Sequence, residues 1–171
     1  MNTLKNNIFT DKYATQGIIN GINKIADAVA LTMGAKGSNA ILETNLYPGY
    51  MITNDGYSIL EKAQFEDPLE ELGRKILFDS VSRANKQSGD GSTTTTVLTQ
   101  SILNAGLQYD VSSTEIKDSL IELLPIIDKL IDEQKKDITE NDVSSVATIS
   151  AESKEIGDLL QEIYQKKVSQ Y

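Results

Sequence analysis

A short glycine-rich segment lies between two stretches whose apolar residues follow helical spacing. Residues 88–96 read Ser-Gly-Asp-Gly-Ser-Thr-Thr-Thr-Thr. The helical pattern before this segment covers residues 68 to about 87, and the pattern after it fades at Gly106. Because glycine accepts backbone conformations that other residues avoid, the segment predicts a tight turn that joins two helices.

The residues of this turn also suit the binding of an anion. Glycines let backbone N–H groups approach an anion, and a helix that begins near Ser92 adds its unpaired N–H groups and the positive end of its dipole. Asp90 would repel phosphate oxygens unless a cation lay between them, so it fits a Mg²⁺ ligand. The segment therefore predicts a seat for a metal-bound polyphosphate.

A surface turn followed by an ordinary helix N-cap is the alternative interpretation of the same residues. The well-known phosphate-binding loop G-x-x-x-x-G-K-[ST] is not the pattern here, because no lysine follows Gly91. A phosphate site at this turn would have to be of a different design.

Composition limits the chemistry. The chain has 171 residues and a net charge of −9, which suits about one domain and argues against nucleic acid or an anionic membrane as the main partner. It has no cysteine and no histidine, so catalysis would depend on carboxylates, hydroxyls, lysine or a bound hard cation.

The two ends of the chain and its apolar runs bear on its location. No apolar run approaches membrane-spanning length, and residues 1–10 are polar without the apolar core of a signal peptide. The simplest expectation is the cytoplasm. Tyr171 arrives in the middle of a helical pattern, so we expect the chain to be cut from something longer.

The predicted elements give a mainly α fold with a small β-hairpin. We expect a helix over 14–33 that ends at Gly34, strands at 40–42 and 51–53 around a turn at 47–49, and a short helix over 57–63 after the second carboxylate-bearing turn, Asn54-Asp55-Gly56. The next helix begins with Asp67 as N-cap and Pro68 at its first position, and Glu70 is expected to reach back to the cap.

The last third of the chain has a second clear helix start. Ser112 and Glu115 form a capping box before a helix to about residue 136, in which Pro125 predicts a kink. Residues 143–150 are expected to be a connector of small residues. An amphipathic stretch follows from Glu152, and its apolar face has no obvious partner in the chain.

Five groups of residues, in order along the chain, resemble the group I chaperonins, the bacterial sixty-kilodalton class. They are Ala26–Val29 with Leu31–Gly37, Ile52–Gly56, Glu66–Pro68, Ala84–Asn85 with Gly89–Thr94, and Ala147–Ala151.

The resemblance implies an ATP-dependent molecular chaperone subunit, represented by a truncated N-terminal portion. Residues 1–138 would be the N-terminal half of the equatorial ATP-binding domain, a multihelical bundle that is incomplete relative to the family. Residues 139–171 would begin the intermediate, or hinge, domain. A naturally short nucleotide-binding module without efficient ATPase activity is one alternative, and a helical structural protein without a ligand is another.

The resemblance also implies a set of site residues. Asp90 would hold Mg²⁺, and Asp55 would lie near the γ-phosphate of ATP and assist its loss, while K⁺ enters as a further cation by family analogy. The residues expected to bind the nucleotide are Thr32, Met33, Gly34, Ala35, Asn54, Asp90, Gly91, Ser92, Thr93, Thr94 and Ile149.

This sequence departs from the family pattern at several positions. The family usually has proline at Ala35, arginine at Ser38, lysine at Asn54 and threonine at Ser92. The loss of the lysine weakens charge neutralisation at the phosphates.

Other parts of the family's machinery would lie beyond Tyr171. These are the apical domain, the second equatorial segment and the aspartate that orients the attacking water, so we do not expect efficient ATP turnover by this chain alone. The partners implied for the full-length form are a homo-oligomeric ring, unfolded client proteins and a co-chaperonin.

Overall fold

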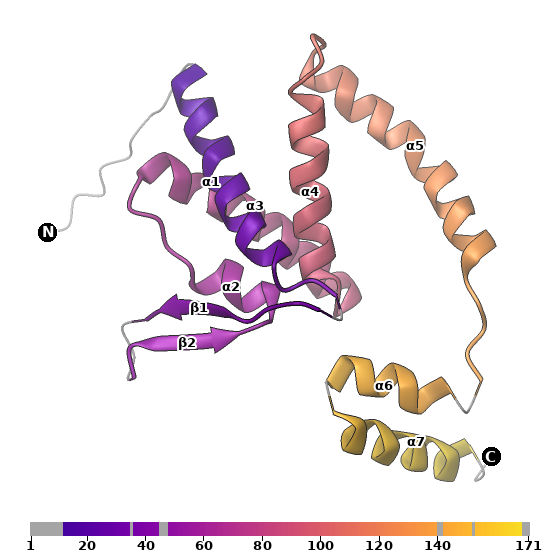
Figure 1. Ribbon diagram of the computed structural model, residues 1–171. Coiled ribbons are helices and arrows are strands. Elements are labelled where there is room, and N and C mark those ends of the chain that lie inside the picture. Colours follow the sequence, from indigo (N-terminus) through magenta and orange to yellow (C-terminus); the bar gives the residue numbers. More distant parts are fainter. Residues whose placement is uncertain (1–11, 35, 45–47, 140–141, 152, 169–171) are drawn as a thin grey trace, which may run out of the picture. The chain divides into compact units, whose positions relative to one another are not determined.

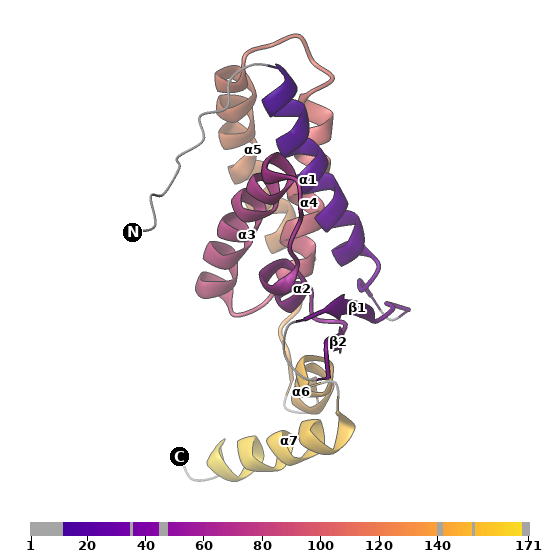
Figure 2. The same cartoon turned by 90° about the vertical axis from the view of Figure 1, so that its left-hand side faces the viewer.

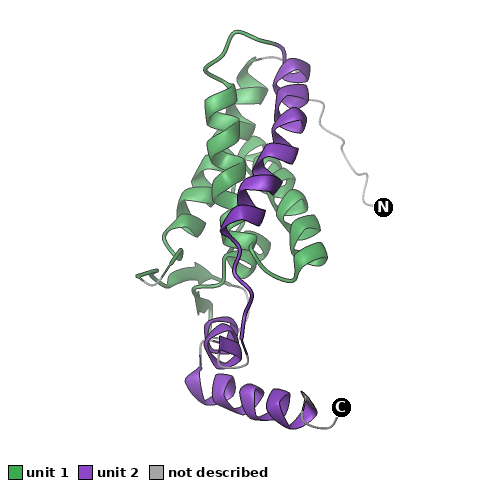
Figure 3. Cartoon of the chain, turned by 90° about the vertical axis from the view of Figure 1, so that its right-hand side faces the viewer, with its two compact units in different colours: residues 1–111 green, residues 112–171 purple. Residues whose placement is uncertain are grey.

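The computed structural model describes residues 12–34, 36–44, 48–139, 142–151 and 153–168. The chain divides into two compact units, residues 1–111 and residues 112–171 (Figure 3), and each is described by itself. The predicted domain boundary at residues 138 and 139 lies inside the second unit and stays a prediction. The predicted turn residue Tyr47, the nucleotide residue Ala35 and the helix start at Glu152 lie outside the described residues.

The first unit consists of helices around one apolar core, with a two-stranded sheet beside it (Figure 1). Its elements are α1 (Lys12–Ala30), β1 (Ala40–Glu43), β2 (Tyr50–Thr53), α2 (Gly56–Lys62), α3 (Pro68–Ser88) and α4 (Ser92–Gly106). Helix α1 contacts both α3 and α4 (Figure 2). The predicted mainly α fold with a small hairpin is confirmed. The buried core residues are Ile22, Ile25, Ala26, Val29, Ile59, Leu60, Leu77 and Val81.

Helices α1 and α3 cross in direct backbone contact. A Cβ atom at Gly21 would overlap the backbone of Glu70, and one at Gly73 would overlap the carbonyl of Ile18. Beside this crossing the Lys24 ammonium lies 2.5 Å from a carboxylate oxygen of Glu70. Glu70 was expected to reach back to the helix cap, and it pairs with α1 instead.

The start of α3 follows the predicted capping otherwise. Asp67 is the N-cap, its carboxylate accepts the N–H groups of Leu69 and Glu70, and Pro68 occupies the first turn. Helix α1 ends three residues earlier than predicted. The N–H and the hydroxyl of Thr32 both donate to the carbonyl of Val29, which turns the chain out of the helix before Gly34.

Strands β1 and β2 are antiparallel, with Ala40 opposite Thr53 and Leu42 opposite Met51. The alternation of the strands puts Ala40 and Leu42 against the core, whereas Ile41 and Ile52 are exposed on the other face. The predicted hairpin is therefore confirmed.

The second unit contains α5 (Ser113–Gln134), α6 (Val143–Ala151) and α7 (Lys154–Val168). The predicted capping box is present, since Ser112 accepts the N–H of Glu115 and the Glu115 carboxylate accepts the N–H of Ser112. The kink at Pro125 stays a prediction.

Two expectations for the second unit were wrong. Residues 143–150 form most of α6, a helix and not a connector. The apolar helix that follows does have a partner, because α7 packs on α6. A Cβ atom at Gly157 would overlap the hydroxyl oxygen of Thr148, so small residues let the two backbones approach. The hydroxyl of Ser144 also donates to Asp158 at 2.7 Å.

None of the helices in the described ranges is long and apolar enough to cross a membrane.

Candidate functional site

The first turn of α2 packs against the first turn of α4 and the last turn of α1. Helix α2 begins at Gly56, directly after its N-cap Asp55. A Cβ atom at Gly56 would overlap the hydroxyl oxygen of Thr93 and would lie 2.9 Å from Cγ1 of Val29. Residues 29, 56 and 93 therefore meet at one place, although they are far apart in the sequence. This place joins the two carboxylate-bearing turns that the sequence singled out.

The N-terminus of α4 has no side-chain cap. Its N-cap is Gly91, which has a left-handed backbone with φ 85° and brings no side-chain hydrogen bond. Gly89, two residues earlier, has φ 75° and ends α3. The N–H groups at the start of a helix have no intrahelical acceptor, and they coincide with the positive end of its dipole. This end of α4 is therefore suited to an anion.

Asp90 lies between these two glycines and is exposed. One of its carboxylate oxygens, Oδ1, accepts the N–H of Gly91 at 2.6 Å, and the hydroxyl of Ser88 lies 2.7 Å from its carbonyl oxygen. Within the described ranges its other carboxylate oxygen, Oδ2, accepts no hydrogen bond. A local turn thus holds the side chain and leaves one oxygen open toward solvent.

A cluster of acidic side chains does not accompany Asp90 in the part of the chain that the structure describes. No group of three or more Asp or Glu residues within the part of the chain that the structure describes could hold a metal ion. Mg²⁺ commonly takes one or two carboxylates and completes its shell with phosphate oxygens and water. One open carboxylate fits such an ion when a polyphosphate is present, and it would not hold the ion tightly without one.

Asp55 serves as the N-cap of α2. Its Oδ1 accepts the N–H of Tyr57 at 3.2 Å, and its Oδ2 accepts the N–H and the hydroxyl of Ser58 at 3.1 Å and 2.5 Å. The N–H of Asp55 donates to the hydroxyl of Thr53 at 3.1 Å. The predicted catalytic carboxylate is exposed but firmly oriented. Its capping role was not predicted, although aspartate before a helix start is a recognised signal.

The predicted residues after α1 lie in a loop that closes on itself. The N–H of Ser38 donates to the carbonyl of Leu31 at 2.8 Å, and Gly34 has φ 78°. Thr32 is buried and its hydroxyl is bonded to α1, whereas Met33 and Gly34 are exposed. If this loop binds a ligand, Met33 and Gly34 offer the accessible atoms.

Of the remaining predicted residues, Ser92 and Thr93 are half-buried and Thr94 is exposed in the first turn of α4. Asn54 is exposed between β2 and α2. Ile149 lies on α6 in the second unit and is 79% exposed. The roles of Asn54 and Ile149 stay predictions.

Two side-chain contacts between α1 and α4 hold the helix whose N-terminus is described above. The side-chain amide of Gln100 donates to the carboxylate of Asp27 at 2.7 Å. The side-chain amide of Asn104 donates to that of Asn23 at 2.9 Å. Neither contact was predicted from the sequence, because the partners are far apart in the chain and form no local sequence pattern.

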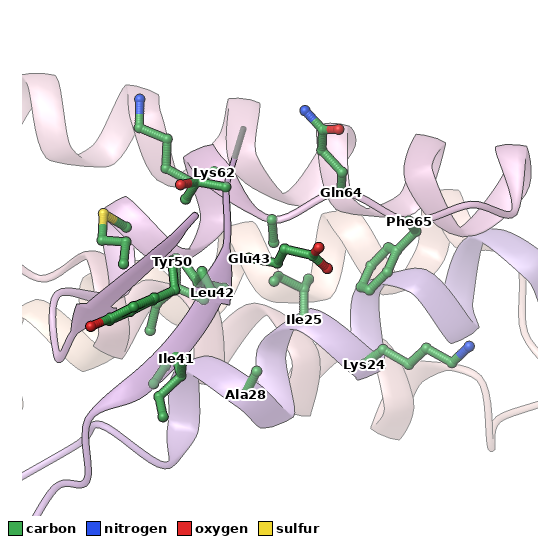
Figure 4. Close-up of a pocket in the computed structure, with 15 residues that line it drawn as sticks. Lys24, Ile25, Ala28, Ile41, Leu42, Glu43, Tyr50, Lys62, Gln64 and Phe65 are labelled. Atoms are coloured by element: carbon green, nitrogen blue, oxygen red, sulfur yellow. The ribbon is translucent and has the colours of Figure 1, made fainter. Parts of the chain in front are cut away.

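A groove of about 810 Å³ lies elsewhere on the first unit, between α1, the hairpin and the segment after α2 (Figure 4). Ile25, Leu42 and Phe65 contribute to its apolar lining, and Lys24 and Lys62 extend away from it on different sides. None of the predicted nucleotide residues lines it. The groove is therefore distinct from the meeting point of α1, α2 and α4.

The first unit is mainly helical. The uncapped N-terminus of α4 directly follows the Asp90 turn and lies beside the Asp55 turn. The family model of the TCP-1/cpn60 chaperonin family matches residues 25–169. The chain belongs to this family, and the resemblance inferred from the sequence is confirmed.

Curated relatives include two bacterial proteins named chaperonin GroEL. The protein of Acholeplasma laidlawii is 34% identical over 159 residues, which cover 91% of this chain and 30% of the relative. The protein of Onion yellows phytoplasma is 33% identical over 163 residues, which cover 93% of this chain and 30% of the relative. The chain therefore spans about 30% of the length of these relatives.

Solved structures share the fold. The chaperonin gp146 from bacteriophage EL 2 (Pseudomonas aeruginosa), crystallised in the presence of ATP-BeFx, matches in two crystal forms with TM-scores of 0.74 and 0.75 and 22% identity. The matches cover 90% and 92% of this chain, and 28% and 29% of gp146. At this identity the likeness supports the fold alone.

Proposed function

We propose that this chain binds Mg-ATP at the meeting point of α1, α2 and α4, as the phosphate-binding part of a chaperonin subunit. The observation that carries the proposal is the N-terminus of α4, which Gly91 leaves without a side-chain cap, beside the exposed carboxylate of Asp90. An uncapped helix N-terminus attracts phosphate oxygens, and the carboxylate attracts the cation that accompanies them.

The residues divide into three roles. The N–H groups of Ser92, Thr93 and Thr94, together with Gly91, would receive the phosphates, and Asp90 would hold Mg²⁺. Met33 and Gly34 would contact the nucleotide from the loop after α1, with Thr32 supporting that loop. Ala35, Asn54 and Ile149 enter the proposal by family analogy alone, as does K⁺.

Asp55 is proposed to assist the loss of the γ-phosphate. Phosphoryl transfer depends mainly on positioning and on stabilisation of charge, so a carboxylate held by its own helix start and a bound cation suffice without histidine. Its bonds to Tyr57 and Ser58 fix its orientation, and Gly56 places it next to Thr93. We do not expect rapid turnover from a chain that spans 30% of its relatives.

The activity of a whole chaperonin is part of the proposal by membership of the family. It comprises ATP-driven assistance of protein folding, a homo-oligomeric ring, unfolded client proteins, a co-chaperonin and a cytoplasmic location. The family match over residues 25–169 supports this wider proposal.

A short nucleotide-binding module without efficient ATPase activity is the second candidate. One observation favours it: asparagine occupies position 54, where the family usually has lysine. The two candidates share the same site and differ in turnover.

Calorimetric titration of Mg-ATP into the full chain tests the shared site. We expect binding that weakens when Mg²⁺ is left out and weakens in Asp90→Asn, which keeps the size of the side chain and removes its charge. Asp110→Asn is the matched control, because Asp110 is an exposed aspartate beyond the end of α4 in the same unit. Absence of binding at millimolar Mg-ATP would reject the proposal.

A further inference from the structure

A partly buried ion pair lies near the start of α3. The side chains of Arg74 and Glu71 are 8% and 19% exposed. The guanidinium makes two parallel bonds to the carboxylate, Nε to Oε2 at 2.9 Å and Nη2 to Oε1 at 2.7 Å. This two-point geometry is the strong form of the interaction. The bond from Arg74 is the main reason that the pKa of Glu71 is lowered from its ordinary value to about 2.

The pair also bonds to the backbone at the end of α2. The remaining guanidinium nitrogen, Nη1 of Arg74, donates to the carbonyl of Leu60 at 2.5 Å. The carboxylate of Glu71 accepts the N–H of Phe65 at 3.2 Å. Because α2 ends at Lys62, the Leu60 carbonyl is one of the last four in the helix. Such carbonyl groups have no N–H donor within the helix. The ion pair therefore caps α2 and closes the connection between α2 and α3.

Helix α2 joins this ion pair to the proposed nucleotide site. It has seven residues, a length of about 10 Å at the usual rise per residue, and a helix this short depends on tertiary contacts. At one end Arg74 holds Leu60. At the other end are Asp55 and Gly56, and Gly56 packs against Thr93. A movement of the C-terminal end of α2 along the helix axis would move the Asp55 carboxylate by a similar amount.

We propose that Arg74 and Glu71 are positioning residues, which fix α2 so that the Asp55 carboxylate lies beside the first turn of α4. The effect of this positioning on nucleotide binding rests on the proposed function, whereas the bonds of the pair are seen in the structure. Burial of an ion pair is weak evidence of a gain in stability, because desolvation offsets much of the attraction. The bonds to Leu60 and Phe65 give this pair a directional role that two packed apolar side chains could not supply.

Amide hydrogen exchange in the full chain, read by NMR, tests the positioning without nucleotide. The variants are Arg74→Lys and Glu71→Gln, which keep similar size but cannot form the same set of bonds. The probes are the amides of Tyr57 and Ser58, which donate to Asp55. Each rate is divided by the rate for the core amide of Val81, which reports opening of the core.

We expect this ratio to rise by about tenfold in both variants, since local opening is more sensitive than the core to a lost anchor. Arg83→Met is the matched control, because Arg83 pairs with Asp79 on the exposed face of the same helix. It should leave the ratio unchanged. If Tyr57 and Ser58 keep the wild-type ratio in Arg74→Lys and Glu71→Gln, the pair is merely structural and the proposal is overturned.

A doubly apolar variant covers the case in which a single variant fails to fold. Glu71→Leu with Arg74→Met removes both charges, which often costs little stability. The proposal expects this folded variant to show the raised exchange ratio, and an unchanged ratio would overturn it.

Mg-ATP affinity separates the two proposals. If the wild-type chain binds Mg-ATP, Arg74→Lys should bind more weakly while Arg83→Met binds normally. Equal affinity in Arg74→Lys would overturn the link to the site. If the wild-type chain does not bind Mg-ATP, the proposed function fails, and the exchange ratio still decides whether the pair positions Asp55.

Discussion

Gly56 and Thr93 are so close that a Cβ atom on the glycine would overlap the threonine hydroxyl oxygen. Gly56 is the first residue of α2 and Thr93 is the second residue of α4, and both helix starts follow an aspartate turn. This contact brings the Asp55 turn and the Asp90 turn near each other, and it underlies the proposal that they form one site.

Gly56→Ala should therefore separate the two helix starts. The added methyl group would also lie 2.9 Å from Val29 and 3.4 Å from Cα of Thr93, so we expect a loss of about 1–3 kcal/mol in the free energy of unfolding, as for other overpacked sites. Urea denaturation measures the loss. Thr93→Ala in the same chain removes the nearest atom and should restore part of it. If the losses in unfolding free energy of the two single variants simply add in the double variant, the two helix starts are not in close contact.

Gly91→Ala tests backbone conformation without crowding. Gly91 has φ 85°, and a Cβ atom there would meet nothing within 4 Å. The expected cost is about 1–2 kcal/mol for a left-handed residue other than glycine, and it comes from strain alone. Denaturant unfolding checks the cost. A variant as stable as the wild type would mean that the turn adopts another conformation.

Asp55 has an observed role as the N-cap of α2 and a proposed role at the γ-phosphate, and two variants distinguish them. Asp55→Ala removes the acceptor for the N–H groups of Tyr57 and Ser58, so we expect a loss of about 1 kcal/mol from the missing N-cap. Asp55→Asn keeps a good cap without the charge and should stay within a few tenths of a kcal/mol of the wild type. Thermal unfolding compares them. If the two variants lose the same stability, the charge of Asp55 is structural, and its proposed role at the γ-phosphate loses support.

The free energy of unfolding should decrease as the pH is lowered through the range in which Glu71 titrates. Its pKa is lowered from 4.5 to about 2, chiefly by its bond to Arg74, so the folded state favours the ionised form. This contribution is fully present above about pH 5 and is lost as the pH falls towards 2. With allowance for solvent screening we expect roughly 1–2 kcal/mol.

Glu71→Gln isolates this contribution. Other carboxylates with lowered pKa values also titrate at acid pH, for example Asp142 beside Thr139. The difference in unfolding free energy between the wild type and Glu71→Gln should therefore shrink between pH 5 and 2.5. A difference that stays constant over this range would contradict the lowered pKa of Glu71.

Local signals made much of the fold predictable. The cap at Asp67 with Pro68, and the capping box of Ser112 with Glu115, are patterns of a few adjacent residues, and the structure contains both. The hairpin was predictable from alternating apolar residues around a turn. The turn at Asp90 was predictable from its two glycines, because a left-handed backbone favours glycine.

Contacts between distant residues were not predictable in this way. Glu70 had the right spacing for a cap, but Lys24 on α1 lies within 2.5 Å and binds it instead. Residues 143–150 form a helix whose small side chains let α7 approach. Their sequence has no periodic apolar pattern that would have predicted this helix. Arg74 resembles any charged residue in a helix until its bond to Leu60 is known.

Titration of Mg-ATP into the full chain, followed by the amide resonances of residues 91–94 in NMR, tests the proposed phosphate site most directly. We predict that the largest saturable shifts fall on Ser92, Thr93 and Thr94, whose N–H groups begin α4, and that they diminish in Asp90→Asn. Shifts confined to the separate groove at Ile25 and Phe65, or no saturable shift anywhere, would contradict a phosphate site at the start of α4.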